Sequence, residues 1–103
     1  MRYPKEQNIY GYKYKVKLDE NLIENKNAIG LFQSKPRLIS IQKGLDSDTG
    51  QRTYLHECVH GVLHRLGVDI LISNEINEII TEGVSNFIVD EKKNILKILN
   101  QKK

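Results

Sequence analysis

The hydrophobic residues of this chain follow two different periods, and the period changes near residue 45. Residues 9–18 alternate between apolar or tyrosine side chains and lysines, and a period of two indicates a half-buried strand. Two shorter β-type runs, residues 28–33 and 37–42, are separated by a turn-like segment at residues 34–36 and are typical of a hairpin. The first half of the chain therefore predicts a small antiparallel three-stranded sheet.

Apolar residues recur at helical spacing in the second half of the chain. Asp48 and Gln51 have the spacing of a capping box at the start of a helix, and Gly67 stands where the helix is expected to end. We expect the apolar stripe of this helix to face the core. The stripe consists of Leu55, Val59, Val62, Leu63 and Leu66.

Further helices are predicted after residue 73. Ser73 or Asn74 can cap a helix that begins at Glu75. Its apolar stripe consists of Ile76, Ile79, Ile80, Val84 and Phe87. Asp90 can cap a last helix that carries Ile95, Leu96, Ile98 and Leu99. The order of elements predicts an α+β fold in which two or three helices follow the sheet.

Length and composition limit the class of protein. A chain of 103 residues is expected to form a single domain, with residues 1–8 and 101–103 loose. No apolar run approaches the roughly 18 residues that span a bilayer, and no signal peptide is recognisable. A single cysteine, Cys58, fits a reducing compartment. We therefore expect a cytoplasmic protein without a membrane partner, and the abundance of Ile, Asn and Lys suggests a bacterial host with an AT-rich genome.

The net charge of +3 is unevenly distributed. Lys13, Lys15 and Lys17 alternate along one face of the first predicted strand, and more lysines lie near the C-terminus. A solvated strand face and a solubilising tail explain this pattern better than a nucleic-acid surface, because no basic residues interleave with aromatic residues on one face.

The chemistry of the chain is indicated by the sequence His56-Glu57-Cys58-Val59-His60, an H-E-x-x-H motif. Residues four apart on a helix lie one turn apart on the same face, so His56 and His60 can bind one metal ion. Glu57 is adjacent and can accept a proton from water. On a helical wheel the histidines lie at the edge of the apolar stripe and Glu57 points away from it. We therefore expect Glu57 to face an open cleft.

A catalytic zinc ion needs a third protein ligand. His64 lies about 12 Å along the axis from His56, too far to share one ion, and Cys58 points to another side of the helix. The remaining candidates are carboxylates of the next helix. Glu82 lies nearer the apolar boundary than Glu78 and is the expected ligand, with Glu78 as the runner-up. Gly83 would allow the two helices to approach closely.

The chain resembles the small phage-type zinc metallopeptidases of the ImmA/IrrE-like class. The resemblance is carried by residues 54–67, which contain the H-E-x-x-H motif, and by residues 82–87, in which Asn86 follows Glu82 by four positions. It implies a minimal zincin-like core of the gluzincin type and one zinc ion per chain. It also implies a protein or peptide substrate, such as a repressor or another regulator of a phage or mobile element. By analogy, residues 37–42 would be the edge strand that pairs with the substrate.

The expected function is that of a zinc-dependent metallo-endopeptidase. His56, His60 and Glu82 would hold the zinc ion, and Glu57 would accept a proton from the attacking water. His64 or Asn86 would assist by stabilising the oxyanion or by orienting a ligand.

Two other functions remain open. The chain can be a zinc-containing binding or regulatory module without catalysis, which would require a fourth protein ligand. It can also be a regulator that binds DNA or another protein and keeps the motif as a relic. DNA binding that depends on salt but not on a chelator would favour this last reading.

Overall fold

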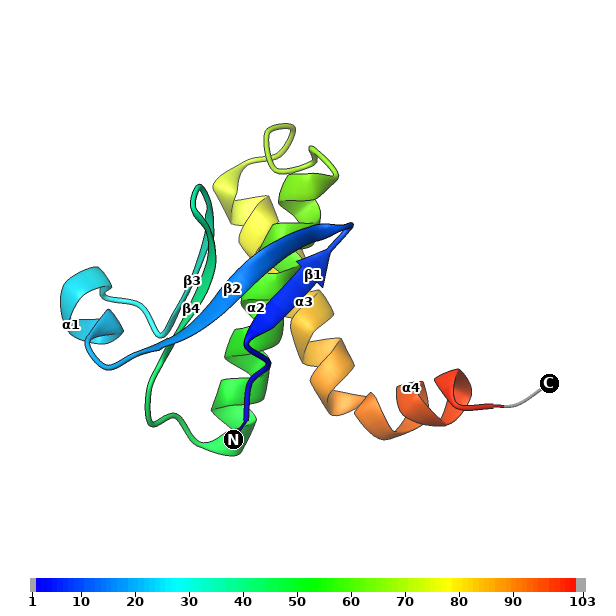
Figure 1. Ribbon diagram of the computed structural model, residues 1–103. Helices are drawn as coiled ribbons and strands as arrows, with labels where there is room; N and C mark the ends of the chain where they lie inside the picture. Colours follow the sequence, from blue (N-terminus) through cyan, green and yellow to red (C-terminus); the bar gives the residue numbers. More distant parts are fainter. Residues whose placement is uncertain (1, 102–103) are drawn as a thin grey trace.

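A computed structural model describes residues 2–101 and gives them an α+β fold with a four-stranded mixed sheet and four helices (Figure 1). The strands are β1 (Glu6–Ile9), β2 (Tyr12–Asp19), β3 (Gly30–Ser34) and β4 (Arg37–Gln42). The helices are α1 (Leu22–Lys26), α2 (Ser47–Arg65), α3 (Asn74–Asp90) and α4 (Lys92–Leu99). The predicted α+β class and the order of a sheet followed by helices are confirmed.

The sheet has the strand order β1-β2-β4-β3, in which β2 and β4 are parallel and the other pairs are antiparallel. The prediction of three antiparallel strands is wrong in detail. The predicted strand over residues 9–18 is two strands, because Tyr10 and Gly11 both adopt positive φ, at 49° and 82°, and turn the chain in a tight hairpin. Residues 6–8 therefore belong to β1 and are not loose, whereas residues 1, 102 and 103 lie outside the described part of the chain.

Helix α1 and strand β3 connect the parallel strands β2 and β4. Residues 22–26 form α1, in which Leu22 is 2% exposed. The chain passes through α1 and then through β3 before it returns as β4 beside β2. The predicted hairpin of the second and third strands is confirmed, with Ser34 opposite Arg37.

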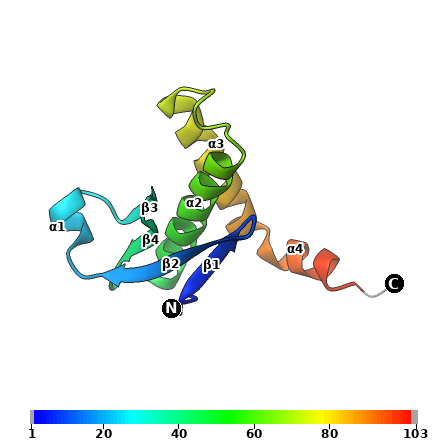
Figure 2. The same ribbon diagram turned by 45° about the horizontal axis from the view of Figure 1, so that its top comes forward.

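Helix α2 packs against one face of the sheet, and the core lies between them (Figures 1 and 2). The core is built from Ile9, Tyr14, Ile39, Ile41 and Tyr54. The face of α2 toward the sheet is centred on small and polar residues, among them Gly50, Glu57 and Gly61. A Cβ atom at Gly61 would lie 2.5 Å from Ile9 Cδ1, so this glycine allows the helix and the sheet to approach closely.

The orientation predicted for α2 is confirmed only in part. Leu63 is 8% exposed and Val62 packs against the core, but Leu66 is 57% exposed. The sheet lies mainly against a neighbouring flank of the helix, which carries Tyr54 and where Gly61 leaves room for it. The N-terminal cap also differs from the prediction, because the Asp46 carboxylate, rather than Asp48, accepts a hydrogen bond from the Thr49 amide.

The predicted end of α2 at Gly67 is confirmed. Gly67 has a φ of 74° and its amide donates to the His64 carbonyl, while the Val68 amide donates to the Leu63 carbonyl. These two bonds form a Schellman motif, which satisfies the last carbonyl groups of the helix and turns the chain toward α3.

Helix α3 runs antiparallel to α2 and packs mainly against it (Figure 1). Ser73 caps it, as predicted, by accepting a hydrogen bond from the Ile76 amide. The side chains toward α2 are small and polar, with Thr81 at 0% and Ser85 at 1% exposed. The predicted apolar stripe of α3 instead faces outward. Gly83 does not bring the helices together, because no described atom lies within 4 Å of a Cβ built there.

Helix α4 leaves the body of the molecule directly after α3 and projects away from it (Figures 1 and 2). The predicted last helix is thus confirmed, but none of its residues is buried. Among residues 2–101, no helix is long and apolar enough to cross a membrane.

Candidate metal centre

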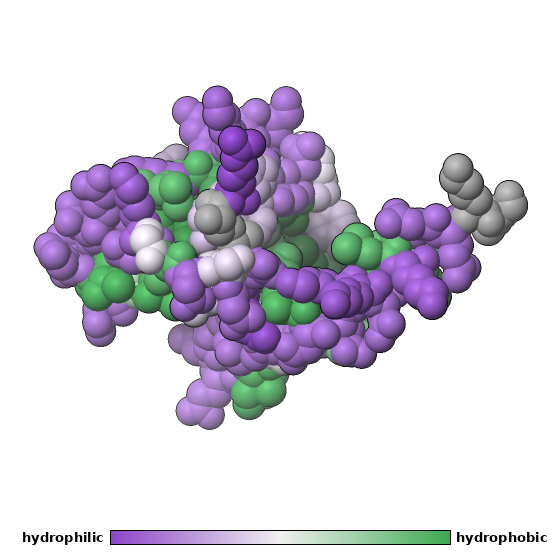
Figure 3. Space-filling model, turned by 90° about the horizontal axis from the view of Figure 1, so that it is seen from below, coloured by the Kyte–Doolittle hydropathy of each residue, from purple (hydrophilic) through white to green (hydrophobic). Residues whose placement is uncertain are grey.

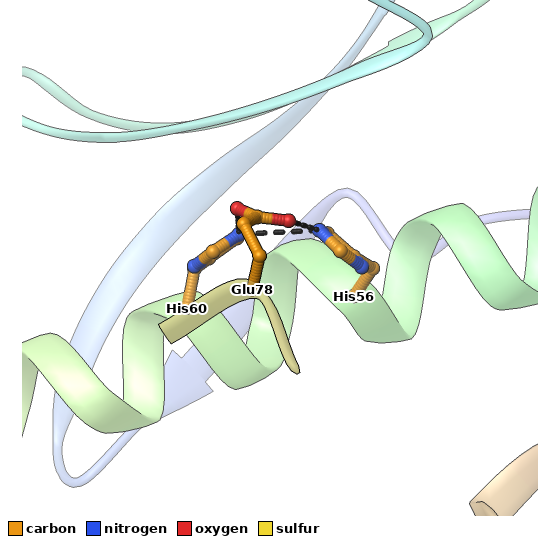
Figure 4. A group of neighbouring side chains, drawn as sticks. All are labelled: His56, His60 and Glu78. Carbon is orange, nitrogen blue, oxygen red and sulfur yellow. Dashed lines mark hydrogen bonds and ion pairs between the residues drawn. The ribbon is translucent and has the colours of Figure 1, made fainter. Parts of the chain in front are cut away.

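His56 and His60 lie one turn apart on α2, and their rings face each other edge to face with centroids 4.8 Å apart. The two Nε2 atoms are 3.1 Å apart (Figure 4). The predicted pairing of these imidazoles on one face of the helix is therefore present in the structure.

Glu78 of α3 reaches both imidazoles (Figure 4). Its Oε1 atom lies 2.9 Å from His60 Nε2, and its Oε2 atom lies 3.3 Å from His56 Nε2. One ligand atom from each of the three residues lies within 4.8 Å of the other two, so this group could hold a metal ion. The residue that the sequence ranked second as a ligand thus stands at the point where both histidines converge.

Glu82, the residue expected to be the third ligand, contacts the opposite nitrogen of His56. Its Oε2 atom lies 3.0 Å from His56 Nδ1, and its Oε1 atom accepts a hydrogen bond from Asn86 Nδ2 at 3.2 Å. Asn86 Oδ1 in turn accepts from Arg52 at 2.9 Å. These contacts orient the His56 ring through its Nδ1 atom, on the side away from Glu78. Metal-binding imidazoles commonly have such a partner at their second nitrogen.

His60 has a corresponding environment. The Thr81 hydroxyl lies 3.5 Å from His60 Nδ1, and burial lowers the pKa of His60, although the nearby Glu78 carboxylate acts in the opposite direction. A lowered pKa favours the neutral imidazole, which is the form that binds a metal ion.

Glu57 is buried, in contrast to the prediction that it points away from the core. It is 7% exposed and lies between α2 and β3, where a Cβ atom at Gly30 would come within 2.8 Å of its Oε2 atom. Burial raises the pKa of Glu57 to about 7, the Glu78 charge adds to the rise, and a backbone hydrogen bond from Phe32 opposes it. The carboxyl group can therefore hold or release a proton near neutral pH.

Two cavities flank the histidine pair, and Gly30, His56 and Glu57 line both. The first, of about 400 Å³, extends toward the N-terminal half of α2 and includes Ile29 and Thr53. The second, of about 360 Å³, extends the other way and includes the three metal-binding candidates together with Phe32, His64, Asp69 and Asn77. Glu57 is thus buried against the sheet and still borders both openings.

Strand β3 supplies Gly30 to both cavities and is an edge strand of the sheet. The expectation that residues 37–42 form the edge strand is wrong, because β4 is paired on both sides, with β2 and with β3. The sequence does not distinguish the two, since their order in the sheet depends on the parallel pairing of β2 with β4.

The other histidine and the cysteine are placed apart from the donor cluster. His64 Nδ1 lies 2.9 Å from Asp69 Oδ2 at one end of the second cavity, so His64 remains a candidate helper and not a ligand. Cys58 packs against the core, and burial raises the pKa of its thiol to about 11. Sequence reasoning missed Asp69, Thr81 and Arg52, whose positions depend on how α3 packs on α2.

The chemistry of the donor set fits a zinc ion. Two atoms bound to one zinc ion at about 2.0–2.2 Å in a tetrahedral arrangement lie roughly 3.3–3.6 Å apart. The two Nε2 atoms, 3.1 Å apart, are close to that range, and each has a different Glu78 oxygen beside it, at 2.9 Å for His60 and 3.3 Å for His56. The Nδ1 atoms of both histidines have oxygen neighbours of their own, which directs the two Nε2 atoms toward the same point.

A scan against protein-family models found no match to this chain, and searches of curated proteins and of solved structures found no significant similarity. The function must therefore be argued from the geometry of the site.

Proposed function

We propose that this protein is a zinc-dependent metallopeptidase whose metal ligands are His56, His60 and Glu78. The observation that carries the proposal is the convergence of two imidazole nitrogens and one carboxylate beside a buried glutamate. Three protein ligands leave one position for water, which is the arrangement of catalytic zinc sites.

Glu82 has a supporting role in this proposal. It contacts His56 Nδ1 and is itself held by Asn86, so it orients the ring and strengthens His56 as a ligand. We assign the third ligand to Glu78 because its two oxygens approach the Nε2 atoms of both histidines.

Glu57 acts as the general base and acid. Zinc held by the three ligands would supply a Lewis acid that activates water and polarises a carbonyl group. The Glu57 carboxylate accepts the proton of the attacking water and passes it to the leaving amine. Its pKa of about 7 matches both tasks near neutral pH.

The substrate would be an extended segment of protein or peptide. Strand β3 is an edge strand beside the donor cluster, and a peptide can pair with such an edge through its backbone. The side chains on either side of the cleaved bond would then enter the two cavities. A regulatory protein of the bacterial host or of a phage remains the proposed target, as the sequence resemblance implies.

His64 is the proposed helper at the second cavity. The Asp69 carboxylate lies 2.9 Å from Nδ1 and holds the ring at the lining of this cavity. From this position the His64 ring can contact the carbonyl group of a substrate that enters the cavity.

Metal analysis of the purified protein tests the ligand set. The wild-type chain, after growth with zinc, is expected to contain one zinc ion, and His60→Ala and Glu78→Gln are expected to lose it. Glu82→Gln should keep zinc with an affinity lowered about 10–100-fold, because it removes an orienting contact and not a ligand. Lys17→Gln, on the exposed part of β2, is the control. Wild-type protein free of metal would contradict the proposal.

Cleavage is tested with casein and a mixed peptide library as substrates. Wild-type protein should cleave one or both, and a chelator should abolish the activity. Glu57→Gln should retain zinc and lose activity by at least about 100-fold, since general acid–base catalysis contributes at this scale. Zinc binding without cleavage of any library peptide would favour the alternative of a zinc-containing binding or regulatory module.

A further inference from the structure

Helix α4 is amphipathic, and most of its apolar residues are exposed in the part of the chain that the structure describes. Leu96 is 54% exposed, Ile98 64% and Leu99 71%, and no residue of the helix is buried. An isolated helix of this length is marginal in water, and helices in proteins gain most of their stability by burying an apolar face. The exposed face of α4 therefore needs a partner surface.

The outer face of α3 carries the second unpartnered apolar surface. Ile76, Ile79, Val84 and Phe87 are between 42% and 71% exposed. Gly83 lies among them, and no described atom lies within 4 Å of a Cβ built there, so a second helix can approach closely. Seen from below, apolar side chains appear on the projecting arm and on the adjacent body, on either side of a hollow (Figure 3). Exposed apolar residues gathered in this way are typical of an interaction site.

The two surfaces cannot meet within one chain. Only Glu91 separates α3 from α4, and with a φ of −107° and a ψ of 16° it bends the chain so that α4 turns away from α3 (Figure 1). Antiparallel packing of two consecutive helices needs a loop of about 2–5 residues. Helix α4 is therefore unable to fold back onto the outer face of its own α3.

The two helices carry opposite charges. Residues 74–91 contain five acidic residues and no Lys or Arg: Glu75, Glu78, Glu82, Asp90 and Glu91. Helix α4 contains Lys92, Lys93 and Lys97 and no acidic residue. Glu75 has no role in the metal site, and it lies in the first turn of α3, next to Ile76. Charge and apolar character are thus complementary between α3 and α4.

We propose that α4 of one copy packs on the outer face of α3 of a second copy, and that the reverse contact forms a two-fold symmetric dimer. A two-fold axis makes both contacts identical and closes the assembly, so no apolar stripe remains exposed. The paired arms run antiparallel, which brings Lys97 of one copy to Glu75 of the other. This proposal does not depend on the metal or on catalysis.

Sedimentation equilibrium of the full chain tests the dimer. The wild type is expected to be dimeric, and Phe87→Lys and Leu96→Glu are expected to be monomeric with unchanged helix content by circular dichroism. Ile23→Lys on α1, 48% exposed and outside both helices, is the matched control and should remain dimeric. A monomeric wild-type chain overturns the proposal, and so does a dimer that persists in both apolar variants.

A charge exchange tests the antiparallel direction. Glu75→Lys and Lys97→Glu are each expected to weaken the dimer several-fold, and the double variant should recover the wild-type affinity because the pair is restored with reversed signs. A double variant that is weaker than both single variants would overturn the antiparallel contact.

Discussion

Glu57 is buried against the sheet and also lines both cavities, a combination that a surface glutamate does not have. Gly30 makes this position possible, because any larger side chain on β3 would occupy the space of the Glu57 carboxyl group. The residue is thus held in place by the packing of a strand on a helix. This packing also raises its pKa, since it removes water from the carboxyl group.

The metal-free protein should lose stability as the pH rises past the range in which Glu57 ionises. The pKa of Glu57 is about 7 in the folded chain against 4.5 without burial, so the folded state binds the proton more tightly. The contribution of Glu57 to the free energy of unfolding is therefore fully present below about pH 4.5. It is lost as the pH rises from there through about 7, and the total loss is roughly 3 kcal/mol. Urea unfolding of metal-free protein at several pH values measures it. Glu57→Gln should remove this part of the pH dependence, and an unchanged profile would contradict the burial of the charge.

The residue positions that could be predicted from the sequence are those fixed by a single helix. The spacing of His56 and His60 places both imidazoles on one face, whatever the rest of the fold. The choice between Glu78 and Glu82 could not be predicted, because both lie on the same flank of α3 and differ by one turn. The outcome depends on how far α3 is shifted along α2, which no local pattern specifies.

At the scale of elements, α3 is the helix whose environment departs most from its pattern. Its apolar stripe is exposed, and Thr81 and Ser85 are buried against α2. A period of 3.6 shows which residues share a face, but it does not show whether the chain itself or a second molecule covers that face. The same reasoning was only partly right for α2, where Val62 of the stripe packs against the core but Leu66 is exposed.

Gly61, within α2, and Gly83, within α3, should respond in opposite ways to substitution by alanine. Gly61→Ala places a Cβ atom 2.5 Å from Ile9 Cδ1 and 3.0 Å from Phe32 Cε1, and this overpacking should cost about 1–3 kcal/mol. Gly83→Ala meets no described atom and should gain up to about 1 kcal/mol from helix propensity. Thermal unfolding at a concentration too low for self-association compares the two. Equal effects of both substitutions would contradict the close packing at Gly61.

At the scale of the whole molecule, the class was predictable and the strand order was not. The change from a period of two to helical spacing separates the sheet from the helices, and this gives the α+β class. The parallel pairing of β2 with β4 joins residues far apart in sequence, and the segment between them includes α1, which has one buried residue, Leu22, and a weak pattern. The sheet, α2 and α3 together bring His56, His60, Glu57 and Glu78 into one site.

The central claim is that His56, His60 and Glu78 bind one zinc ion beside Glu57. Anomalous diffraction from crystals of the zinc-loaded protein, measured on both sides of the zinc absorption edge, tests it most directly. The account predicts one anomalous peak per chain, within about 2.0–2.2 Å of the Nε2 atoms of both histidines and of a Glu78 oxygen. A peak bound by Glu82 in place of Glu78, or no peak between the histidines, would contradict it.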